Sequence, residues 1–240
     1  QAVKDGATRP VYYESRVIKL KLNDEILGKI DAEYDRLRSD GASETDIEEN
    51  KKQMSHMDAL LGNDVTINDL VKDIITHYED NRQHVCCGKA MIVAYSRPIA
   101  MKIYKRILEM RPNWTEKAKV VMTSGNQDPE EWADIIGGKA YKKELAKKFK
   151  DENDPMKIAI VVDMWLTGFD VPSLATMYVY KPMKDHNLMQ AIARVNRVFK
   201  DKPGGLIVDY IGIGTSLKKA LNFYANSGGK GVPAESQERA

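Results

Sequence analysis

The chain has 240 residues, of which 42% are hydrophobic and 30% are charged, as in a globular protein with one substantial core. Its formal net charge of +2 is too small to predict nucleic-acid binding, so any such contact must come from a local patch. No apolar run approaches ~18 residues, which argues against a transmembrane helix and a membrane partner.

The chain starts at Gln1 and has neither an initial Met nor the basic and apolar regions of a signal peptide. We therefore expect an internal piece of a longer polypeptide. The two cysteines, Cys86 and Cys87, are adjacent, which is too close for an ordinary structural disulfide. Reduced thiols are the simplest interpretation, and they indicate a cytoplasmic protein.

The first 82 residues have the pattern of a strand followed by mostly helical segments. Within residues 11–22, Ile18, Leu20 and Leu22 alternate with lysines at the period of a strand. Polar residues that commonly cap helices follow at three places. These expected helix starts are Asn23, Ser43 and Thr66. We predict that residues 1–82 form an N-terminal strand plus helical extension.

From residue 83 the pattern changes to short apolar runs that alternate with amphipathic segments. The apolar runs are 90–95, 119–122, 158–162, 175–180 and 205–209, and the expected helices are 98–110, 129–149 and 186–199. Asp128 and Pro129 have the order of a cap and a first-turn proline. The alternation predicts an α/β fold with a mostly parallel sheet flanked by helices. Residues 226–240 are expected to be a linker or a disordered tail.

Ligands of parallel sheets bind beyond the carboxyl ends of the strands. Polar residues follow three of the expected strands directly, and we expect them to line one edge of the sheet. They are Ser96 and Arg97, Thr123 and Ser124, and Thr167. Two alternatives stay open here: Ser96 is also a suitable cap for the next helix, and residues 123–126 also have the composition of an ordinary loop.

Residues 190–197 have the clearest functional pattern. In a helix, Gln190, Arg194 and Arg197 would stand at i, i+4 and i+7 on one face. Apolar residues occupy the opposite face at the same period. They are Leu188, Ile192, Val195 and Phe199. Two arginines that point to one place repel each other unless an anion lies between them, and a triphosphate suits two planar donors best.

The chain lacks the rest of a nucleotide site. It contains no G-x-x-x-x-G-K-[ST] sequence, and no predicted strand ends in paired acids that could bind Mg²⁺. The four histidines have no metal-ligand spacing, so no metal site is expected in this chain. We conclude that this chain can contact a nucleoside triphosphate but cannot bind and activate it unaided.

Two motifs in order then resemble a known family. Residues 163–172 (DMWLTGFDVP), followed by 180–183 (YKPM) and 190–197 (QAIARVNR), resemble motifs V and VI of superfamily 2 helicases. The particular residues in these motifs resemble those of the motor subunit of type I restriction endonucleases. Residues 90–97 are similar to motif IV of the same superfamily. The resemblance implies that residues 83–225 form a RecA-like second helicase lobe. Ala193 departs from the pattern, because many relatives have Gly there.

The resemblance also implies roles for individual residues. Arg197 would be the arginine finger, Arg194 its partner on the γ-phosphate, and Gln190 a sensor of the nucleotide. Gly168 and Asp170 would approach the nucleotide, whereas Thr167 would touch a DNA phosphate. Further contacts with the DNA backbone would come from the strand ends. These residues are Ser96, Arg97, Thr123 and Ser124.

The implied ligands and partners extend beyond this chain. ATP and Mg²⁺ would be bound mainly by a preceding RecA-like lobe, and double-stranded DNA would be moved before a nuclease domain of the same subunit cuts it. Modification and specificity subunits would complete the enzyme.

Alternatives to this interpretation stay open. The chain could belong to another superfamily 2 nucleic-acid helicase or remodeller, or be a non-catalytic anion-binding module. Asp170 could simply form a turn, and Trp165 and Phe169 could be packing residues.

Overall fold

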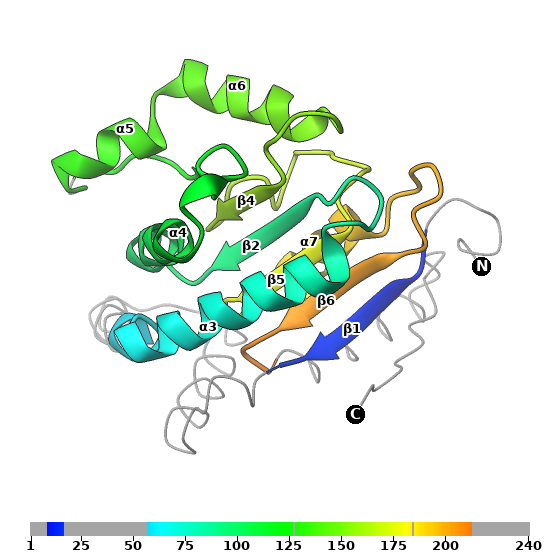
Figure 1. Ribbon diagram of the computed structural model, residues 1–240, viewed down its shortest axis with the longest axis horizontal. Helices are drawn as coiled ribbons and strands as arrows, with labels where there is room; N and C mark the ends of the chain where they lie inside the picture. Colours follow the sequence, from blue (N-terminus) through cyan, green and yellow to red (C-terminus); the bar gives the residue numbers. More distant parts are fainter. Residues whose placement is uncertain (1–8, 17–56, 127, 184, 213–240) are drawn as a thin grey trace.

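The computed structural model describes residues 9–16, 57–126, 128–183 and 185–212 (Figure 1). Several sequence predictions lie outside these residues. They are the predicted strand beyond Arg16, the helices expected to start at Asn23 and Ser43, and the linker 226–240. Within the described ranges, no helix is long and apolar enough to cross a membrane.

The core of the fold is a six-stranded sheet in which every pair of neighbouring strands is parallel. The order across the sheet is β1-β6-β5-β2-β4-β3. The strands are β1 Val11–Ser15, β2 Ala90–Ala94, β3 Ala118–Val121, β4 Ile158–Val161, β5 Thr176–Tyr180 and β6 Gly205–Asp209. All residues of β2, β4 and β5 are buried, which explains why they read as continuous apolar runs rather than alternating ones. The predicted parallel α/β fold is confirmed.

Helices cover both faces of this sheet. In Figure 1, α3 and α4 lie in front of the strands and α7 lies behind them. The α-helices are α3 Asp64–His77, α4 Arg97–Met110, α5 Ala133–Ile136, α6 Lys139–Lys150 and α7 Asp185–Val195. Shorter helical turns are η2 Tyr78–Arg82, η3 Pro112–Trp114 and η4 Glu130–Trp132. The arrangement places the carboxyl ends of the parallel strands at one common edge.

Two of the predicted helices before α7 have different boundaries in the structure. α3 begins at Asp64 rather than near Thr66, because the side chain of Asn63 caps it and accepts a hydrogen bond from the amide of Val65 at 3.0 Å. The single helix expected over 129–149 is divided into η4, α5 and α6. It breaks at Gly137, whose φ of +60° belongs to a conformation that favours glycine.

Asp128 does not act as the predicted helix cap. One of its carboxylate oxygens, Oδ2, forms an ion pair with Arg97 and accepts a hydrogen bond from the amide of Gly125 at 2.7 Å. η4 has no side-chain cap. The carboxylate therefore connects the loop after β3 to the start of α4. Because Arg97 and Asp128 are far apart in the sequence, no local sequence pattern predicts this contact.

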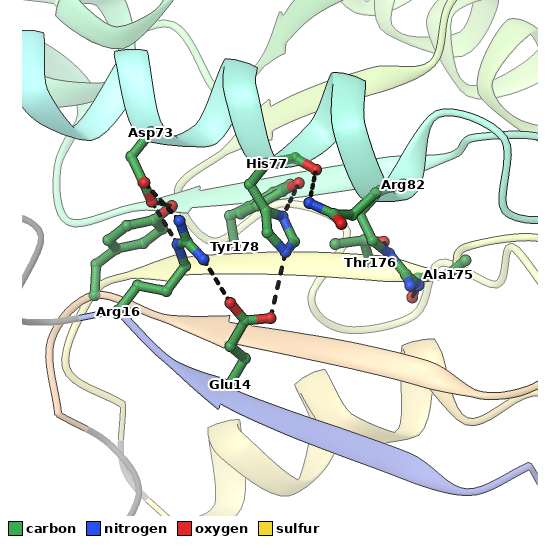
Figure 2. A network of polar contacts seen from close by, with 10 residues as sticks. Glu14, Arg16, Asp73, His77, Arg82, Ala175, Thr176 and Tyr178 are labelled. Carbon is green, nitrogen blue, oxygen red and sulfur yellow. Dashed lines mark hydrogen bonds and ion pairs between the residues drawn. The ribbon is translucent and has the colours of Figure 1, made fainter. Parts of the chain in front are cut away.

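The N-terminal strand is joined to the rest of the molecule by the polar network in Figure 2. The guanidinium of Arg16, directly after β1, donates two hydrogen bonds to Asp73 of α3, at 2.6 and 2.7 Å, and one to Glu14 at 2.6 Å. The other carboxylate oxygen of Glu14 lies 3.3 Å from Nε2 of His77, and Nδ1 of His77 is 2.9 Å from the hydroxyl of Tyr178. The network thus connects β1, α3 and the central strand β5.

The described parts of residues 1–82 share one sheet and one core with the residues that follow. β1 pairs with β6 along its whole length, and the hydroxyl of Tyr180 donates to the carbonyl of Leu61 at 2.9 Å. Arg82 donates to the Thr176 hydroxyl at 2.7 Å. The boundary at residue 82 stays a prediction, and the contacts across it are those of packed neighbours.

Candidate functional site

The candidate site is built around the β4–β5 loop, residues 162–175, which crosses from one strand to the other without a helix. Trp165 has a φ of +69°, which is unusual for a residue with a side chain, and Gly168 has a φ of +67°. The Trp165 ring stacks between Phe149 and Phe169, with centroid separations of 5.4 and 4.1 Å. The aromatic stack fixes the loop against α6, so Trp165 and Phe169 are packing residues here.

Lys181 fixes the beginning of this loop. Its ammonium, just after β5, donates to the carboxylate of Asp163 at 2.6 Å and to the carbonyl of Val162 at 3.4 Å. The two residues are 18 positions apart, and their strands are separated by β2 in the sheet. Sequence reasoning gave Lys181 no role, because only the folded sheet brings these strand ends together.

Arg194 is bound to the backbone of the loop. Its Nε donates to the carbonyl of Leu166 at 3.1 Å, and its Nη1 donates to the carbonyl of Phe169 at 3.0 Å. The two accepting carbonyls bracket Thr167 and Gly168. Hydrogen bonds from a guanidinium are stronger than those of neutral donors, so Arg194 sets the position of this part of the loop. Gln190 lies one turn earlier on α7 and is partly buried.

Arg197 does not share a helical face with Arg194, so that prediction was wrong. α7 ends at Val195, two residues before Arg197 and well before the predicted end at residue 199. The carbonyl of Asn196 accepts a hydrogen bond from the amide of Arg9 at 2.7 Å. In a continuing helix that carbonyl would accept a hydrogen bond from the amide of residue 200. Here it accepts from the segment before β1 instead, so the helical hydrogen-bond pattern does not continue.

The predicted apolar face of α7 is confirmed as far as the helix extends. Leu188, Ile192 and Val195 are all buried, whereas Phe199 lies beyond the helix and is only half-buried.

Arg197 nevertheless reaches the same loop as Arg194. Its Nε lies 3.2 Å from the carboxylate of Asp170, and the two side chains are 50% and 51% exposed. Such an exposed ion pair is weak and is easily replaced by a stronger anion. The structure therefore brings together Gly168, Asp170, Arg194 and Arg197, with one arginine engaged by the backbone and the other accessible to solvent.

The remaining predicted residues form a second group at the carboxyl ends of β2 and β3. Ser96 caps α4, where its hydroxyl accepts from the amide of Ile99 at 3.5 Å and donates to Asp58. Burial raises the pKa of Asp58, and the hydrogen bond from Ser96 opposes that rise. Thr123 and Ser124 are exposed on the neighbouring loop.

Arg97 connects the two loops of this group. Its guanidinium binds Asp128, whose carboxylate also accepts from the amide of Gly125. The group presents polar side chains and backbone from two adjacent loops, which is the kind of surface that contacts a phosphate backbone without reading sequence.

The residues present suit an anion better than a metal. In the described ranges there is no group of three or more His, Cys, Asp or Glu side chains that could bind a metal ion. The exposed guanidinium of Arg197 has donors that fit phosphate oxygens. Within the part of the chain that the structure describes, Nη2 of Arg194 has no hydrogen bond, since the two backbone bonds use Nε and Nη1. The site can therefore contribute positive charge to a phosphate that is bound elsewhere.

Comparison with known proteins places this geometry in a family. Residues 113–212, which include the β4–β5 loop and α7, match the profile of type I restriction enzyme subunit R domain 3. The HindI endonuclease subunit of Haemophilus influenzae, a type I restriction enzyme subunit, is 44% identical over 246 residues. The alignment covers 98% of this chain and 22% of that subunit. The MjaIXP endonuclease subunit of Methanocaldococcus jannaschii is 44% identical over 231 residues, with coverages of 96% and 22%.

A solved structure has the same fold. It is a fragment described as an HsdR subunit of a type I restriction enzyme from Vibrio vulnificus, with a TM-score of 0.57 and 15% identity. The match covers 99% of this chain and 38% of that one. The chain spans about a fifth of the length of the two curated relatives. From the shared domain and the sequence identity together, the chain belongs to the family of type I restriction enzyme R subunits.

Proposed function

We propose that this chain is the second RecA-like lobe of an ATP-driven double-stranded DNA translocase, the motor part of a type I restriction endonuclease R subunit. ATP and Mg²⁺ are bound mainly by a preceding lobe, and a nuclease domain of the same subunit cuts the DNA. Modification and specificity subunits supply methylation and site recognition. The matches to endonuclease subunits support the family part of this proposal.

The observation that carries the mechanism is the contrast between the two arginines of residues 190–197. Arg197 is half exposed and is paired only with the exposed Asp170 among the described residues, so it is available to a phosphate. When the lobes close on ATP, its guanidinium leaves Asp170 and stabilises the charge that develops on the transferring phosphoryl group. In this proposal, Gly168 of the β4–β5 loop and Gln190, one turn before Arg194 on α7, also contact the nucleotide.

Arg194 has two functions in this proposal. Its Nε and Nη1 keep the β4–β5 loop in place, and its remaining Nη2 faces the γ-phosphate in the closed state. Because Thr167 lies between the two bonded carbonyls, a shift of Arg194 toward phosphate also moves the residue that contacts DNA. The second group, Ser96 and Arg97 with the loop after β3, adds further contacts to the DNA backbone. These contacts bind and release the DNA backbone in alternation, and this moves the duplex.

The test is the Arg197→Ala variant of the complete subunit. We expect it to lose DNA-stimulated ATP hydrolysis by a factor of about 10³ or more, the effect typical of arginine fingers, while ATP binding changes little. Steady-state phosphate release and binding of a fluorescent ATP analogue measure the two properties separately.

Arg106→Ala is the matched control. Arg106 lies on α4 and forms a surface ion pair with Glu109, its neighbour at i+3, at 2.9 Å. Its removal should leave hydrolysis unchanged. Normal turnover by Arg197→Ala would exclude the arginine-finger assignment.

A further inference from the structure

One face of α6 carries four lysines, which we call the α6 lysine row. They are Lys139, Lys143, Lys147 and Lys150, and all four are exposed. At 100° per residue these positions fall within about 80° of the helix circumference. The buried residues of α6, Leu145 and Phe149, lie on a different side and pack into the core. The row therefore points to solvent as a continuous basic strip.

The charges of this row are not neutralised within the described ranges, where no acidic side chain forms an ion pair with any of the four lysines. Elsewhere, exposed lysines do have acidic partners: Lys102 with Asp64, Lys105 with Glu131, and Lys200 with Glu152. On α6 itself, Glu144 pairs with Lys148, which lies outside the row. Like charges four residues apart destabilise a helix, so an external anion would relieve this arrangement.

The spacing of the row suits a phosphate backbone. Successive lysines are separated by about 4.5–6 Å along the helix axis, and the whole row is ~16 Å long, given a rise of 1.5 Å per residue. One DNA strand carries a phosphate about every 3.4 Å along its axis, so the row is long enough to meet several phosphates. Lysine on a flexible stem is a suitable partner for such contacts, because it needs no fixed geometry.

The row is continuous with the β4–β5 loop. The ammonium of Lys150 lies 5.0 Å from the centre of the Phe169 ring, and Phe169 stacks on Trp165. Phe169 directly follows Gly168, and Thr167 is the residue proposed to touch DNA. One end of the lysine row therefore begins beside the loop, and the row extends the basic surface away from it along α6.

We propose that the α6 lysine row binds the phosphate backbone of duplex DNA and extends the contact made by the β4–β5 loop. This inference rests on the proposed function, because it assumes that the loop faces DNA. The row contributes affinity but no sequence recognition, as expected for ammonium groups on phosphates.

The test compares two double variants of the complete subunit. Lys143→Gln/Lys147→Gln removes two charges from the row, and Lys102→Gln/Lys105→Gln removes two charges from α4, where both lysines are already paired with acids. Binding of a labelled duplex of arbitrary sequence is measured by fluorescence anisotropy over a range of KCl concentrations. Unchanged thermal unfolding of both variants confirms that they fold.

We expect the row variant to lower the slope of log K against log salt by about 1.8, because each phosphate contact contributes about 0.9. The α4 variant should keep the wild-type slope. Equal slopes for the row variant and the wild type, with normal binding of the duplex by both, would overturn the inference and leave the proposed function intact. The lysine row would then suit an acidic protein surface. A wild-type subunit that does not bind duplex DNA would overturn the proposed function itself.

Discussion

Two arginines three positions apart have different environments in this molecule. Arg194 donates to two backbone carbonyls, whereas Arg197 forms only an exposed ion pair with Asp170 in the described part of the chain. In the proposed function, a structural role and a catalytic role are thus divided between neighbouring side chains of the same type. The division can be tested by measuring stability, without any assay of ATP hydrolysis.

Lysine substitutions separate the two roles. Arg194→Lys should lower the free energy of unfolding by about 1–2 kcal/mol, because one ammonium cannot reproduce the two-carbonyl contact of a planar guanidinium. Arg197→Lys should change it by less than ~0.5 kcal/mol, as is usual for an exposed pair. Urea denaturation of the two variants gives both values, and equal losses would contradict the division.

At the residue scale, the sequence provided candidate site residues but did not predict their contacts in the fold. The spacing of Gln190, Arg194 and Arg197 suggested one helical face, and this failed because the Asn196 carbonyl bonds to Arg9, a residue 187 positions away. The partners of Arg194 are backbone carbonyls, which no side-chain pattern specifies. The interpretation of Ser96 as a helix cap, which needs only local residues, is confirmed.

At the scale of elements, β1 and α3 are joined by charged groups rather than by apolar packing alone. The hydrogen bond with His77 and the one from Arg16 lower the pKa of Glu14 from an ordinary 4.5 to about 2, against the opposing effect of burial. A carboxylate whose pKa is lower in the folded state stabilises the fold above its unfolded pKa. That contribution is lost as the pH falls from about 4.5 to about 2.

Glu14→Gln therefore should produce a pH-dependent loss of stability. At pH 7 we expect the variant to unfold about 1 kcal/mol more easily than the wild type, because Arg16 and His77 lose a charged partner. This difference should shrink as the pH falls from about 4.5 toward 2, where Glu14 becomes protonated in the wild type as well.

Urea titrations at a series of pH values measure the effect. The control is Glu109→Gln on α4, where a surface pair with Arg106 is removed and a change below ~0.5 kcal/mol is expected. A Glu14→Gln difference that is constant from pH 7 to pH 2 would refute the linkage.

The elements themselves were largely predictable, because the sheet is buried on both sides and its strands are short apolar runs bounded by polar loops. The parallel arrangement follows from the alternation of these runs with helices. The break of the predicted helix 129–149 at Gly137 was missed although Gly137 and Gly138 form an adjacent glycine pair, which is a turn signal, because the helical pattern on both sides suggested one continuous element. The order of the strands, with β1 beside β6, depends on contacts far apart in sequence and was not predicted.

At the scale of the whole molecule, the chain has half of the chemistry that the proposed reaction needs. It carries donors for phosphate but contains no phosphate-binding loop sequence. We therefore expect the purified chain alone to release no phosphate from ATP, even with Mg²⁺ and duplex DNA present. A phosphate-release assay with the complete subunit as the positive control measures this, and turnover by the chain alone would show that it has a complete site.

The bond between Arg9 and Asn196 has a mechanical consequence. Because the amide of Arg9 binds the carbonyl one residue before Arg197, the segment that leads into β1 is tied to the residue that follows the end of α7. We therefore expect a pull on the polypeptide at Arg9 to reach the segment around Arg197 through the bond to Asn196 and the bond from the Arg9 guanidinium to the carbonyl of Lys200. The segment before the edge strand would thus act as a short lever on the arginine that we propose to contact phosphate.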